Sequence, residues 1–110
     1  MTNPIFEKIQ KDIGENDVVL YMKGTKQMPQ CGFSATVVEV LKRSGIENFK
    51  DVNVLADQEI REGIKAFANW PTIPQLYIKG EFVGGCDIVR EMYQSGELQA
   101  LLKEKGVQAA

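Results

Sequence analysis

The sequence predicts an α/β fold in one domain over residues 1–110, with a small four-stranded mixed sheet flanked by helices on both faces. Three observations predict it. The run Val18–Met22 is continuously apolar, as in a central strand that is buried on both faces. Several longer segments repeat apolar residues every three or four positions, which is the period of amphipathic helices. Two short apolar stretches flank Lys79-Gly80, which is the pattern of a tight hairpin.

The first helix is expected from Pro4, because Asn3 can cap it and proline is favoured at the first helical position. Its inward face consists of Ile5, Ile9 and Ile13. Gly14 is expected to end this helix, and the strand at 18–22 follows. After the strand comes a polar loop, residues 23–30, which contains glycine and proline.

A second helix is expected to begin at Cys31 and to end just before Gly45. Its inward face consists of Phe33, Val37, Val40 and Leu41. Residues 49–54 are a second strand candidate, and Asp57 can cap a third helix after it. The inward face of the third helix consists of Ile60, Ile64 and Phe67.

The segment Trp70–Pro74 cannot continue the third helix, because its two prolines lack the N–H donor. The hairpin follows in residues 76–83, and Asp87 can cap a fourth helix that Gly96 breaks. The apolar residues of this helix and of a last amphipathic piece are Ile88, Met92, Leu98, Leu101 and Leu102. We expect the first two strands to be parallel, with a right-handed crossover, and the hairpin strands to be antiparallel.

The composition excludes several classes of function. Thirteen basic and fifteen acidic residues give a net charge of -2, which argues against nucleic acid or an anionic membrane surface as the main partner. No apolar stretch approaches the ~18 residues of a membrane span, and residues 1–4 lead into the first helix without a targeting segment. The expected location is the cytoplasm, where thiols are kept reduced. The absence of histidine removes Cys-His and Ser-His-Asp catalysis and every imidazole-ligated metal site.

The run Cys31-Gly32-Phe33-Ser34 places a thiol at the expected start of the second helix, with serine where a redox pair has its second cysteine. A helix N-terminus favours the thiolate over the thiol, and Lys23, at the end of the first strand, can add to this effect. A free cysteine is more often a small buried apolar residue, but the loop and helix start indicate a reactive Cys31. Because Ser34 cannot close an internal disulfide, Cys31 must find its sulfur partner elsewhere or bind a metal.

The segment Gly84-Gly85-Cys86-Asp87 has the composition of an anion-binding turn, because glycines allow close approach and the following amides point at the ligand. Cys86 lies there among apolar neighbours, which leaves packing and chemistry both open as its role. Capping by Asp87 is compatible with either role. Lys23 and Arg61 become binding residues only if the fold brings both to one groove.

Four motifs occur in order along the chain: Lys23-Gly24-Thr25, Pro29–Ser34, Trp70–Leu76 and Gly84–Asp87. Together they resemble the monothiol glutaredoxins of the C-G-F-S type, over nearly the whole chain. The loop before Cys31 is longer than in dithiol glutaredoxins, and the Trp-Pro pair is typical of the monothiol class. The resemblance implies a thioredoxin-like fold and a cis Ile73–Pro74 peptide bond.

The resemblance also implies a groove for glutathione. Lys23 and Arg61 would meet its glycyl carboxylate, and the backbone of Ile73 would pair with its cysteinyl residue. The amides of Cys86 and Asp87 would hold the γ-glutamyl carboxylate, with the Asp87 side chain near the ammonium group.

A [2Fe-2S] cluster needs four ligands, usually thiolates, and this chain offers Cys31 and, with its role open, Cys86. If only Cys31 binds, a symmetric dimer supplies two thiolates and two glutathiones complete the set. This count agrees with what the resemblance implies: a glutathione-ligated cluster that bridges a homodimer and passes to iron-sulfur acceptor proteins. The resemblance adds a BolA-like protein as a partner that replaces one subunit and has the histidine that this chain lacks.

Two other functions stay open. As a glutathione-dependent thiol-disulfide oxidoreductase, the chain would take glutathione from a mixed disulfide onto Cys31, and a second glutathione would resolve it. As a redox regulator, it would form a Cys31–Cys86 disulfide, which requires the two Cα atoms to lie within about 7 Å. Ser34, the long loop and Trp70-Pro71 favour the cluster carrier, with at most weak exchange activity.

Overall fold

The computed structural model describes residues 3–107. Its helices are α1 (Pro4–Glu15), α2 (Gly32–Arg43), α3 (Gln58–Ala68), α4 (Cys86–Ser95) and α5 (Glu97–Glu104). Its strands are β1 (Val18–Met22), β2 (Lys50–Asn53), β3 (Gln75–Ile78) and β4 (Glu81–Gly84). The α/β class that the sequence predicts is confirmed.

The strands form one mixed sheet in the order β2-β1-β3-β4. In the parallel pair β1 and β2, Leu20 lies opposite Asp51, and in the antiparallel pair β1 and β3, Leu20 lies opposite Leu76. The strands β3 and β4 form the antiparallel hairpin. The parallel first pair and the hairpin were both predicted. Because β1 has a neighbour on each side, all five of its residues are buried.

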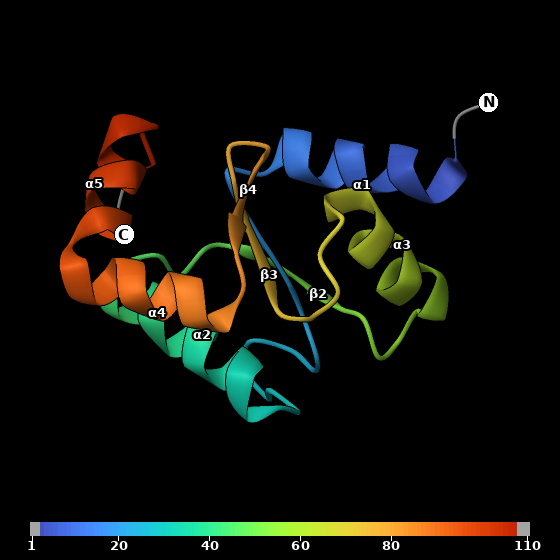
Figure 1. Cartoon of the computed structure of the whole chain (residues 1–110), viewed down its shortest axis with the longest axis horizontal. Helices are drawn as coiled ribbons and strands as arrows, with labels where there is room; N and C mark the ends of the chain where they lie inside the picture. Colours follow the sequence, from blue (N-terminus) through green and yellow to red (C-terminus); the bar gives the residue numbers. More distant parts are fainter. Residues whose placement is uncertain (1–2, 108–110) are drawn as a thin grey trace.

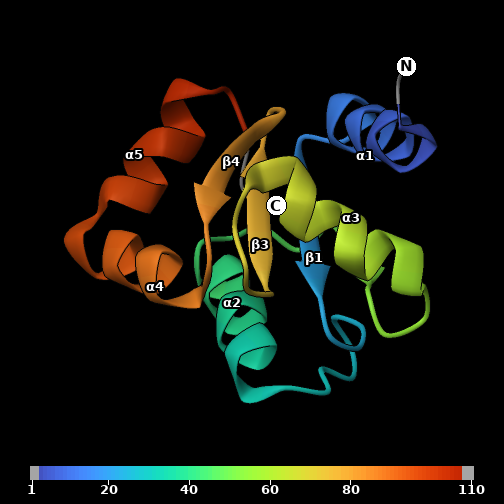
Figure 2. The same cartoon turned by 45° about the vertical axis from the view of Figure 1, so that its right-hand side comes forward.

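Two layers of helices enclose the sheet, with α1 and α3 on one face and α2, α4 and α5 on the other (Figures 1 and 2). Successive residues of β1 pack against opposite layers. Leu20 belongs to the core with α2, α4 and α5, and Tyr21 belongs to the core with α1 and α3. A strand between two apolar layers needs apolar side chains at every position, which explains the continuous apolar run.

Two element boundaries differ from the sequence prediction. Helix α1 passes through Gly14 to Glu15, because Gly14 does not adopt the positive φ with which a glycine usually ends a helix. Strand β2 is shorter than the 49–54 candidate. The two apolar residues at the ends of that candidate, Phe49 and Val54, lie just outside β2 and enter different cores, on opposite faces of the sheet.

Phe33 does not belong to the inward face of α2. The other residues of that predicted face (Val37, Val40 and Leu41) are buried, but Phe33 is 63% exposed, because the buried face of the first turn carries its neighbour Ser34. No helix within residues 3–107 is long and apolar enough to cross a membrane. The expectation about the start of the chain falls partly on Met1 and Thr2, which lie outside the described residues.

Candidate functional site

A groove of about 420 Å³ opens beside Cys31. Four separate stretches of the chain line it: the segment from the end of β1 to the start of α2, one side of α3, the loop between α3 and β3, and the start of α4. The residues that the sequence singled out all lie along it, namely Lys23, Cys31, Arg61, Ile73, Cys86 and Asp87. The condition set for Lys23 and Arg61, that the fold bring both to one groove, is therefore met.

Cys31 is the N-cap residue of α2, and its half-buried thiol is free. Burial by itself raises the pKa of the Cys31 thiol. The backbone amides of Ser34 and Phe33, at the start of α2, act in the opposite direction and stabilise the thiolate. The Ser34 hydroxyl and the Lys23 ammonium add to them, so the pKa of Cys31 lies below its ordinary value. The start of α2 therefore favours the thiolate, which is the nucleophilic and metal-binding form.

Ser34 is fully buried, although it is polar. Its hydroxyl accepts a hydrogen bond from the backbone N–H of Lys23 at 3.1 Å and helps to lower the pKa of the Cys31 thiol. The serine thus connects the end of β1 with the reactive sulfur.

Hydrogen bonds hold the loop between β1 and α2 against β2 and the residue before it. The backbone N–H of Lys26 donates to the Asp51 carboxylate at 2.9 Å, and its ammonium donates to the Phe49 carbonyl at 2.6 Å. The same ammonium lies 4.5 Å from the centre of the Phe49 ring. The N–H of Gly24 donates to the side chain of Asn53 at 2.9 Å. These contacts give the long loop a defined path to Cys31.

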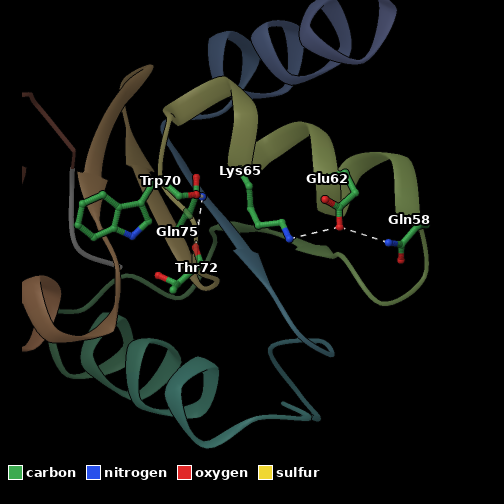
Figure 3. Close-up of polar contacts among 6 residues, drawn as sticks. All are labelled: Gln58, Glu62, Lys65, Trp70, Thr72 and Gln75. Carbon is green, nitrogen blue, oxygen red and sulfur yellow. Dashed lines mark hydrogen bonds and ion pairs between the residues drawn. The ribbon is translucent and has the colours of Figure 1, made fainter.

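Lys65 also lines the groove, in addition to Lys23 and Arg61. Its ammonium pairs with Glu62 at 3.2 Å, and the same carboxylate oxygen accepts from Gln58 at 3.3 Å (Figure 3). Lys23 and Arg61 form no ion pair within residues 3–107. Lys65 was not predicted from the sequence, because a lysine on an amphipathic helix has the pattern of an ordinary solvated charge.

The loop of residues 70–74 forms the next wall of the groove. Its Ile73–Pro74 peptide bond is cis, as the resemblance implied. Within residues 3–107, the Ile73 backbone makes no hydrogen bond to another main-chain group. The side chain of Gln75 holds the loop from the interior by donating to the carbonyls of Trp70 and Thr72 at 3.2 and 3.3 Å (Figure 3).

Asp87 does not cap α4, so that part of the sequence prediction was wrong. The N-cap residue is Gly85, which is the last extended residue after β4, and the helix therefore begins one residue earlier than a cap at Asp87 requires. The exposed Asp87 carboxylate pairs with Arg90 at 3.2 Å. Cys86 is buried at the first helical position, and this burial raises the pKa of its thiol.

The family model for glutaredoxin matches residues 18–83. The chain belongs to the glutaredoxin family. It is 58% identical to probable monothiol glutaredoxin 2 of Rickettsia typhi over 105 aligned residues, and the alignment covers 96% of this chain and 94% of the relative. It is 56% identical over 98 residues to glutaredoxin 4 of Escherichia coli K12, which covers 89% of this chain and 84% of that one. The solution structure of reduced apo GrxS14 from poplar is 49% identical and has a TM-score of 0.81, with 93% of each chain covered.

These relatives confirm both the monothiol glutaredoxin assignment and the thioredoxin-like fold. In this glutaredoxin the position of a second active-site cysteine is held by the buried Ser34. The groove therefore contains an accessible low-pKa thiol, Cys31, and a buried thiol, Cys86, at the start of another helix. Both thiols are free, and a disulfide between them is an alternative that the sequence left open.

Proposed function

We propose that this monothiol glutaredoxin carries a [2Fe-2S] cluster as cargo, held between two copies of the chain with two glutathione molecules, and transfers it to iron-sulfur acceptor proteins. One observation carries the proposal: the Cys31 thiol lines a groove and has a lowered pKa, and Ser34 stands where a redox pair has its second cysteine. Within residues 3–107 no group of three His, Cys, Asp or Glu side chains is placed to hold a metal ion. A cluster with four ligands therefore needs ligands from beyond one chain.

Glutathione is the proposed co-ligand because its groups match the groove. Lys23 and Arg61 offer two cations without ion-pair partners in the described chain, which suit the glycyl carboxylate. Ile73 has a backbone free to pair with the cysteinyl residue. The first amides of α4, from Cys86 and Asp87, suit the γ-glutamyl carboxylate, since a helix N-terminus favours an anion. A volume of about 420 Å³ lies in the range of small-molecule sites.

The ligand count then requires a homodimer. Cys31 from each copy and one glutathione thiol from each groove make four thiolates, and no ligand role is proposed for the buried Cys86. A BolA-like protein is the proposed alternative partner, which would replace one copy and supply the histidine that this chain lacks. Since such a cluster depends on free glutathione and on a second subunit, it is labile enough to be transferred. We propose the cytoplasm as the site of this transfer.

Substitution of the two cysteines tests the proposal. Cys31→Ser should abolish cluster assembly during anaerobic reconstitution with iron, sulfide and glutathione, because a hydroxyl does not replace a soft thiolate ligand. The matched variant Cys86→Ser should retain most of the cluster. Visible absorption and iron content per chain measure both. A normal cluster in Cys31→Ser would contradict the proposal, and complete loss in Cys86→Ser would make Cys86 a ligand.

The lowered pKa of Cys31 also favours a second candidate function, glutathione-dependent thiol-disulfide exchange. The Cys31 thiolate would attack the glutathione sulfur of a protein–glutathione disulfide and release the protein thiolate. The thiolate of a second glutathione would then attack the Cys31 adduct, which gives glutathione disulfide and restores the Cys31 thiolate. A deglutathionylation assay with Cys31→Ser as the inactive control measures this activity.

A further inference from the structure

Gln75 is a fully buried polar residue at the first position of β3, directly after the loop of residues 70–74. Its Nε2 donates to the carbonyl oxygens of Trp70 and Thr72, at 3.2 and 3.3 Å (Figure 3). Its Oε1 accepts from the hydroxyl of Tyr77 at 3.1 Å. Both donor hydrogens and the oxygen of the amide are thus used, as a buried polar group requires.

The hydrogen bond to Thr72 orients the peptide group between Thr72 and Ile73. The Ile73–Pro74 bond is the one cis peptide among residues 3–107, so the Thr72–Ile73 peptide is trans. In a planar trans peptide the C=O and N–H bonds point in opposite directions. Since the Thr72 carbonyl points to the buried Gln75, the N–H of Ile73 points away from it. Ile73 lines the groove, so this N–H is directed outward, to the groove side of the loop.

Tyr77 fixes the orientation of the Gln75 side-chain amide. A side-chain amide turned by 180° exchanges its oxygen and nitrogen, and here that would set the oxygen against the two loop carbonyls. The Tyr77 hydroxyl favours the other orientation, because it donates to Oε1. Burial raises the pKa of Tyr77 to about 12, so the hydroxyl remains a donor. Its ring is held edge-on against Tyr21, with the ring centroids 5.6 Å apart.

We propose that Gln75 is a positioning residue of the groove: by holding the Thr72 carbonyl it aims the Ile73 N–H at the backbone of a bound thiol peptide. Tyr77 fixes the orientation of the Gln75 amide. The inference rests on the proposed function for its occupant, which is glutathione, and it assigns the binding geometry to a residue that does not itself touch the ligand.

Gln75→Met tests this role, because methionine keeps the length of the side chain but donates no hydrogen bond. Trp70 is the single tryptophan of the chain, so its fluorescence reports directly on the loop. We expect the free variant to show a shifted Trp70 emission and a shifted Ile73 amide resonance in ¹⁵N spectra. Its affinity for reduced glutathione, measured by calorimetry, should be about tenfold weaker than that of the wild type.

Ile9→Val is the control for a loss of stability alone, since Ile9 lies in the α1–α3 core and not in the groove. Its glutathione affinity should stay within about twofold of the wild type, since a deleted core methyl group lowers stability without altering the loop.

Gln75→Met with wild-type affinity, emission and Ile73 resonance would overturn the proposal. If Gln75→Met does not fold, Tyr77→Phe replaces it, with an affinity expected to be about two- to threefold weaker and a shifted emission. Wild-type values of both in Tyr77→Phe would overturn the proposal as well.

Failure of the proposed function gives a different result. A wild-type protein that binds no glutathione contradicts that function, and the ligand-free spectra then decide about Gln75. A shifted emission and a shifted Ile73 resonance in free Gln75→Met support the positioning role, and unchanged spectra overturn it.

Discussion

The Ser34 hydroxyl accepts a hydrogen bond from the backbone N–H of Lys23 and helps to lower the pKa of the Cys31 thiol. A second cysteine at this place could close a disulfide with Cys31, whereas the hydroxyl stabilises the thiolate and cannot trap it. The residue therefore keeps the sulfur ionised and available for an external partner. This is the chemistry that both a metal ligand and an exchange nucleophile need.

Removal of the Ser34 hydroxyl should move the reactivity of Cys31 to higher pH. Because hydrogen bonds to the thiolate lower the pKa, Ser34→Ala should raise it, and the alkylation rate at neutral pH should fall roughly three- to tenfold. The rate of reaction with iodoacetamide as a function of pH, measured in a Cys86→Ser background, gives the pKa directly.

Thr36→Val is the matched control for this measurement. It removes a hydroxyl from the same helix, but this hydroxyl donates to the Gly32 carbonyl. Its pH profile should equal that of the parent protein. A Ser34→Ala profile that also equals the parent would show that the hydroxyl has no part in lowering the pKa of Cys31.

The loop from β1 to α2 has a strict backbone requirement at Gly24. Gly24 has a positive φ of 91°, and a Cβ there would lie 2.5 Å from the Met28 carbonyl oxygen and 2.6 Å from the Gln30 nitrogen. Both contacts are with backbone atoms, so no side chain can move aside to relieve them. Only glycine satisfies this position, and the path of the loop to Cys31 depends on it.

Gly24→Ala should therefore destabilise the protein by about 1–3 kcal/mol, the usual cost of a residue forced into such a conformation. Gly14→Ala is the control, because Gly14 lies within α1 with open space around it. It should stabilise the protein by roughly 0.5–1 kcal/mol, as alanine favours a helix interior. Urea unfolding followed by circular dichroism measures both variants. Equal stabilities would contradict this account of the loop.

The sequence predicted those elements whose cause is local. The run at β1 and the caps at Asn3 and Asp57 involve neighbours in the chain, and the structure has all three. The end of α1 at Gly14 and the cap at Asp87 were wrong, because glycine tolerates a helix interior and the extended Gly85 allows an earlier start.

At the scale of the whole molecule, the features that the sequence pattern could not predict are those formed by residues far apart in the chain. The antiparallel pairing of β1 with β3 joins strands far apart in the chain. The same holds for the groove, where Lys65 becomes part of a site only because α3 lies against the loop of residues 70–74. The family resemblance identified six groove residues in advance, but not the support from Gln75, which is buried beneath the loop.

The central claim is that one chain offers a thiol and not a complete metal site. Anaerobic reconstitution with iron and sulfide, with and without glutathione, tests it most directly through visible absorption and size-exclusion chromatography. The account predicts a coloured dimer with glutathione and a colourless monomer without it. A colourless monomer under both conditions, or a cluster formed without glutathione, would contradict it.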